Sequence, residues 1–115
     1  MKEFLFVYRA DYETYPSARK SPEEMQAITQ KWMNWVAGIA AQGKLADRGN
    51  SLVPSGKVLK SNGSISDGPY TEIKESIMGY TLVKASSIEE ATALANGCPI
   101  LSVGGNVEIR EIRAI

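Results

Sequence analysis

Histidine is missing from this sequence of 115 residues, and cysteine occurs once, at Cys98. The lack of histidine excludes a zinc site with histidine ligands, a Ser-His-Asp triad and a Cys-His pair. A single cysteine excludes a disulfide within the chain and agrees with a reducing compartment. We interpret Cys98, which precedes Pro99, as a small buried side chain rather than a nucleophile. Any chemistry must use carboxylates, Lys, Arg, Tyr or backbone groups, and we predict neither a cofactor nor a metal site.

An excess of one charge and a long apolar run are also missing. Thirteen basic and thirteen acidic side chains cancel, so no net field would gather phosphate groups, and we expect no nucleic-acid partner. No stretch approaches the roughly 18 to 20 apolar residues that span a bilayer, so we expect no membrane partner and a cytoplasmic location. The length, with 43% hydrophobic residues, suits one domain over residues 1–115.

Local patterns predict an alternation of strands and helices. "EFLFVYR" is short and almost wholly apolar, as in a strand buried on both faces. Ser21, Pro22 and Glu24 form a capping box that starts an amphipathic helix, and Ser87 with Glu90 repeats this pattern. The expected elements are a strand at 3–9, a helix from 21 to about 42, a short strand at 43–49, a hairpin pairing 58–60 with 64–66 around Asn62-Gly63, a strand at 78–85, a helix from 87 to about 96 and a strand at 106–115.

The order of these elements predicts an α+β fold. Without the inserted β-hairpin the order is βαββαβ, the ferredoxin-like arrangement, in which right-handed crossovers place both helices on one face of an antiparallel sheet. The first strand is apolar on both faces, and one layer of helices cannot cover both. We therefore predict a homodimer in which the sheets pack face to face. The alternative is that the loop at 11–20 or the hairpin folds back over the second face.

A charged segment, "DGPYTEIKESIMGY" at 67–80, follows the hairpin. It resembles the signature of the DGPF group of YCII-related proteins: an Asp-Gly-Pro-aromatic turn, a Glu-x-Lys-Glu element and a Gly-aromatic pair. The resemblance extends to "SIEEA", "CPIL" and "GGNVEIREI". It implies a ferredoxin-like fold of the dimeric α/β-barrel type, in a family that is widespread in bacteria. The His and Asp pair suggested as a site in the YCII branch does not carry over, because this chain has no histidine.

The charged segment is a candidate site for a small organic acid. Glu72 is the candidate base, Lys74 the group that would stabilise a developing anion, and Tyr70 a hydroxyl donor. Such a set suits an isomerase-like or lyase-like reaction. Arg9 and Arg110, at strand ends, could hold the carboxylate of the ligand. The full set of candidate ligand-binding residues is Asp67, Glu72, Lys74, Glu75, Arg9 and Arg110.

Two other interpretations of these charges stay open. In the first they are scaffold: Asp67 closes a turn, Lys74 pairs with Glu75 or Glu72, and Glu108 pairs with Arg9 or Arg110. In the second the protein is a non-catalytic accessory that acts through protein contacts, for example in transcriptional control, because some relatives in the family are encoded beside alternative sigma factors. The sequence does not decide whether the protein is an enzyme.

Overall fold

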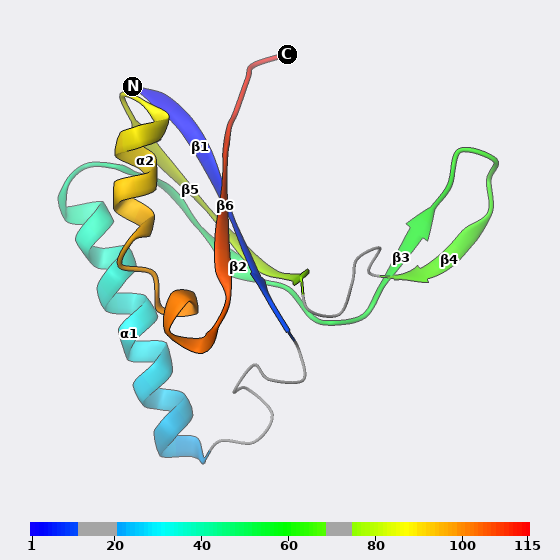
Figure 1. The fold of residues 1–115 in the computed structure, drawn as a ribbon, viewed down its shortest axis with the longest axis horizontal. Coiled ribbons are helices and arrows are strands. Elements are labelled where there is room, and N and C mark those ends of the chain that lie inside the picture. Colours follow the sequence, from blue (N-terminus) through cyan, green and yellow to red (C-terminus); the bar gives the residue numbers. More distant parts are fainter. Residues whose placement is uncertain (12–20, 69–74) are drawn as a thin grey trace.

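The computed structural model describes residues 1–11, 21–68 and 75–115 (Figure 1). Its elements are β1 (Lys2–Ala10), α1 (Pro22–Ala41), β2 (Leu45–Ser51), β3 (Gly56–Leu59), β4 (Ile65–Gly68), β5 (Ser76–Ala85), α2 (Ile88–Ala95), the 3₁₀ helix η3 (Pro99–Val103) and β6 (Asn106–Glu111). Four strands form an antiparallel sheet in the order β2-β5-β1-β6, and β3 and β4 form a separate two-stranded sheet. The ferredoxin-like α+β fold with an inserted hairpin is confirmed; η3 was not predicted.

The central strand β1 divides its side chains between two unequal faces. Phe4, Phe6 and Tyr8 are buried in a core that also holds Ile39 of α1 and Ala91 of α2, so both helices cover the same face. The alternate residues of β1 point to the other face and are only half-buried. We predicted that β1 is buried on both faces. Within the single chain, only its face toward the helices is fully buried.

Helix α1 begins and packs as its sequence predicts. The Ser21 side chain accepts a hydrogen bond from the Glu24 amide, and the Glu24 carboxylate accepts one from the Ser21 amide. Trp32 packs edge-on against Tyr8 with ring centroids 4.9 Å apart, and Trp35 stacks on Phe6 at 6.2 Å. These contacts show that the two tryptophans of α1 pack against the core.

The N-terminal cap of helix α2 differs from the prediction in the partner of the Glu90 carboxylate, which is Ser86 and not Ser87. The Ser87 hydroxyl accepts a hydrogen bond from the Glu90 amide, as expected. The Glu90 carboxylate, however, accepts its hydrogen bonds from the amide and hydroxyl of Ser86, and it pairs with Lys44. Both oxygens of Glu90 thereby find donors, and only half of a capping box forms.

The hairpin β3–β4 has the predicted pairing and stands away from the sheet (Figure 1). Leu59 lies opposite Ile65, and Lys60 donates its amide to the Ser64 carbonyl. Among the turn residues only Gly63 has a positive φ, 85°, so the turn is longer than the two-residue Asn-Gly turn that we expected. We call residues 56–68 the arm. It does not fold back over the sheet (Figure 1). The predicted alternative of a covering loop at 11–20 lies, from residue 12 on, outside the described residues.

The overall dimensions reflect the arm. The radius of gyration is 15.4 Å, whereas a compact domain of this length is expected to have about 13 Å. The extents of 44 × 44 × 19 Å describe a thin slab, one helix layer and one sheet layer thick.

Gly49, at an irregularity of β2, provides a test of this sheet. Its φ is 69°, and a Cβ at this position would lie 1.7 Å from the Tyr80 carbonyl oxygen. We expect Gly49→Ala to lower the free energy of unfolding by about 3 kcal/mol or more, from backbone strain and overpacking together. In the control variant Gly38→Ala, the added Cβ meets nothing within 4 Å, and we expect a gain of up to about 1 kcal/mol. Urea unfolding measures both, and equal effects would contradict the position of β2.

Candidate functional site

The sheet face that lies away from the helices, which we call the open face, carries an apolar centre. Leu5 lies opposite Leu82, and Val7 lies opposite Tyr80 across β1 and β5. All four side chains are half-buried in the single chain. Such a surface in a soluble protein is typical of an interaction site.

Arg9 lies at one end of the open face, opposite Ile77 of β5. Its Nε and Nη2 both lie 3.0 Å from Glu108 Oε1 on the neighbouring strand β6. Its Nη1 donates a hydrogen bond of 3.0 Å to the backbone carbonyl of Glu75. Only 24% of the Arg9 side chain is exposed, so the guanidinium is held in one orientation from two sides.

Arg110 joins this cluster from β6. Its Nη1 donates a hydrogen bond of 3.2 Å to Glu108 Oε2, while 72% of its side chain stays exposed. The Arg9 and Arg110 hydrogen bonds lower the pKa of the Glu108 carboxyl below its ordinary value of 4.5. Two guanidinium groups and one ionised carboxylate leave an excess of one positive charge. The cluster suits the binding of an anion, whereas Glu108, ionised at neutral pH, is a weak general base.

The predicted site residues fall into three groups. Arg9 and Arg110 lie together, and Glu75 adds a backbone oxygen to the same cluster. Asp67 lies on the arm, where it forms an ion pair with Lys57. The remaining residues of the motif lie outside the described residues: Pro69, Tyr70, Glu72 and Lys74. The role of the six predicted ligand-binding residues stays a prediction.

Glu108 is the member of the cluster that our site prediction left out. The sequence analysis considered it only as an ion-pair partner of Arg9 or Arg110, and the structure contains both pairs. The signal that identifies it is its position: Glu108 and Arg110 are two residues apart on β6, and Glu108 lies opposite Val7, which is two residues from Arg9 and on the same face of the sheet. The sheet register thereby brings the three side chains together.

Comparison of the sequence with known protein families gives a match that includes all residues of this cluster. The model of the YCII-related domain matches residues 3–115. The chain belongs to the YCII-related family. The match confirms the family resemblance and includes every element from β1 to β6. No curated protein matches the sequence.

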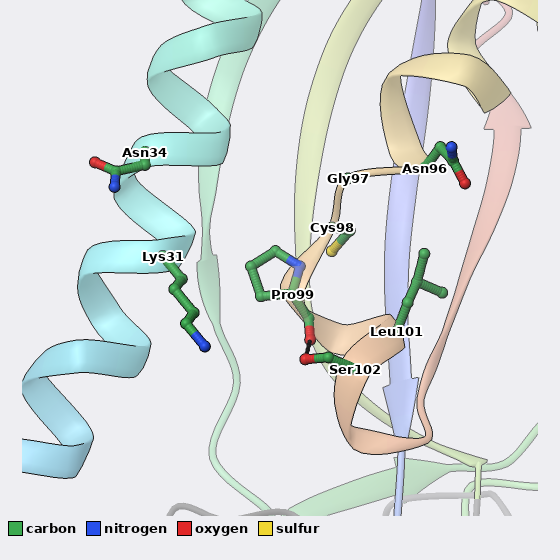
Figure 2. A pocket seen from close by; sticks show the side chains of 8 residues that line it. All are labelled: Lys31, Asn34, Asn96, Gly97, Cys98, Pro99, Leu101 and Ser102. Atoms are coloured by element: carbon green, nitrogen blue, oxygen red, sulfur yellow. Dashed lines mark hydrogen bonds between the residues drawn. The ribbon is translucent and has the colours of Figure 1, made fainter.

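This YCII-related domain also has a hollow on the helix side. The hollow is a groove of about 590 Å³. Its lining residues come from α1 and from the segment that joins α2 to η3 (Figure 2). Lys31 and Asn34 line it from α1, and Cys98 lies in its opposite wall. Burial raises the pKa of the Cys98 thiol to about 12, so the thiol is neutral and unreactive near neutral pH. The groove is broad and open, and it lies across the sheet from Arg9.

The described part of the chain contains neither a candidate metal cluster nor a helix that could span a membrane. Within residues 1–11, 21–68 and 75–115, no group of three or more Cys, Asp or Glu side chains could hold a metal ion. Neither helix in the same ranges is long and apolar enough to cross a membrane.

The pKa of Glu108 tests the geometry of the cluster. We expect Arg9→Gln to raise this pKa more than Arg110→Gln does, because the hydrogen bond from Arg9 is the larger cause of the lowering. NMR titration of the side-chain carboxyl measures both variants. The folded-state pKa is depressed, so the pairing stabilises the fold above pH 4.5 and its contribution is lost as the pH falls through the lowered value. A larger rise in Arg110→Gln, or no rise in either, would contradict the arrangement.

Proposed function

We propose that the protein is a homodimer that binds a small organic acid at the edge of its open face, with Arg9 and Arg110 as the carboxylate-binding groups. The observation that carries this proposal is the guanidinium of Arg9. It is fixed from two sides at the end of an apolar surface and lies beside a second, mostly exposed guanidinium. An orienting cation beside an apolar wall is the usual composition of a small-ligand site.

Each part of the cluster has a role in this proposal. Glu108 fixes the orientation of the Arg9 guanidinium, and its carboxylate neutralises part of the positive charge of that guanidinium. Arg110 supplies exposed N–H donors for a carboxylate, which binds two parallel donors of a guanidinium well. Ile77 and Tyr80 offer contact to the carbon skeleton of the ligand. Coverage of the open face by a second copy would remove water from this edge and strengthen each of these interactions.

The charged segment extends this site in the sequence. Lys74 and Glu72 precede Glu75 by one and three residues, and the Glu75 carbonyl accepts a hydrogen bond from Arg9. Their action as an anion-stabilising group and a base, and with it an isomerase-like or lyase-like activity, stays a prediction. We therefore propose binding of the acid and assign no reaction.

A non-catalytic accessory role is the second candidate. The exposed apolar side chains of the arm, Leu59 and Ile65, favour a protein contact, which such a role requires. This candidate predicts that no small acid binds and that a partner protein is retained by the immobilised chain.

Binding of carboxylic acids tests the proposed function. We expect at least one member of a panel of three- to six-carbon mono-, di- and tricarboxylic acids to raise the melting temperature, while the corresponding amines do not. Arg9→Gln and Arg110→Gln should each weaken binding of that acid, measured by calorimetry, by about 10- to 100-fold, as expected for a lost charge-assisted hydrogen bond.

The control variant is Lys84→Gln, which removes an exposed cation at the far end of the same strands, opposite Glu3. It should leave the affinity unchanged. Glu72→Gln and Lys74→Met should abolish binding and leave the urea unfolding curve intact. A panel with no binding acid, or an equal loss in Lys84→Gln, would contradict the proposal, and unfolding caused by the two segment variants would assign that segment to the scaffold.

A further inference from the structure

The arm carries an apolar pair that has no partner within the described chain. Leu59 and Ile65 lie directly opposite each other in the hairpin register, so both point to one face of the arm. Their exposed fractions are 72% and 66%, among the highest for large apolar side chains in the described residues. The ion pair between Lys57 and Asp67 lies on the same face, two residues further from the turn. One face of the arm thus has an apolar tip and a polar base, the composition of a contact surface.

The arm also lacks structural support of its own. A two-stranded hairpin by itself is marginally stable in water. Among the described residues, the strands β3 and β4 pair only with each other, and the arm projects beyond the end of the main sheet (Figure 1). Contact with a second surface would stabilise both the hairpin and the exposed pair.

The area of the open face helps to identify the second surface that the arm contacts. With β1 nine residues long, the strands rise about 3.3 Å per residue and lie about 4.8 Å apart, so four of them present at most about 600 Å². The shorter strands β2 and β6 reduce this area further. A stable dimer interface buries roughly 600 to 1,000 Å² per partner. The open face alone reaches only the lower end of this range, and a dimer built on it needs additional contact.

We propose that the arm is a reciprocal clasp, in which the Leu59–Ile65 face of each arm packs on a second copy of this chain at the margin of the open face. This inference rests on the homodimer of the proposed function. A second copy fits the requirement because two-fold symmetry brings two arms and two open faces together at once, so the arms and the open faces are covered in one closed assembly. The net charge of zero leaves no overall repulsion between copies.

The dimer dissociation constant tests the clasp. In Leu59→Ser/Ile65→Ser, a dimer loses four apolar side chains from its interface, and we expect the constant from sedimentation equilibrium to rise by about 100-fold or more. The control Met33→Ser removes a similarly exposed apolar side chain from α1 and should leave the constant unchanged. The arm contributes nothing to the core, so circular dichroism should show the same fold in all three proteins.

A crosslink tests the same contact with the other arm residues unchanged. A photoreactive benzoylphenylalanine in place of Leu59 should crosslink two differently tagged copies of the purified protein. Crosslinks within one chain, no crosslink between copies, or an unchanged dissociation constant in the double variant would overturn the clasp. If one of these results is obtained and the wild-type protein is a dimer, only the clasp is overturned and the proposed homodimer is retained. If the wild-type protein is a monomer, both the clasp and the homodimer are overturned.

Discussion

The structure depends on one constraint: two helices on the same side of a four-stranded sheet can cover only one of its faces. The aromatic side chains of β1 and the two tryptophans of α1 fill the covered side and form the core. The other side keeps an apolar centre, from Leu5 to Leu82, without a covering layer in the described chain. The Arg9 cluster at its edge and the arm beyond its end both acquire their proposed roles from this asymmetry.

Signals that are local in the sequence predicted most of the fold. The Ser21 capping box, the three- and four-residue spacing of α1 and the pairing of the hairpin are determined by neighbours within a few residues, and each is present. The predictions that were wrong concern segments whose structure depends on contacts between residues far apart in the sequence. β2 begins two residues later than expected and includes two register shifts, because Gly49 and Asn50 must fit closely against Tyr80 and Gly79 of β5. The 3₁₀ helix η3 begins at Pro99 and packs Ile100 into the core, which no local pattern indicates.

The residues of the Arg9 cluster were considered from the sequence, but their assembly was not predictable. Arg9 and Arg110 are a hundred residues apart, and only the antiparallel pairing of β1 with β6 places Glu108 between them. The Asp-Gly-Pro motif suggested that Asp67 belongs with the other charges. Asp67 lies on the arm with Lys57, and Glu75 contacts Arg9 through its backbone. The motif thus joins two places, the arm and the edge of the open face, and both adjoin the surface that we assign to a second copy.

The central claim is that a second copy covers the open face, and the molar mass of the native protein tests it most directly. Light scattering at low micromolar concentration should give twice the chain mass of 12.5 kDa. Val7→Asp, which places a charge at the centre of the open face, should give the mass of one chain with an unchanged circular dichroism spectrum. A wild-type mass of 12.5 kDa would contradict the account, as would a Val7→Asp variant that remains a dimer.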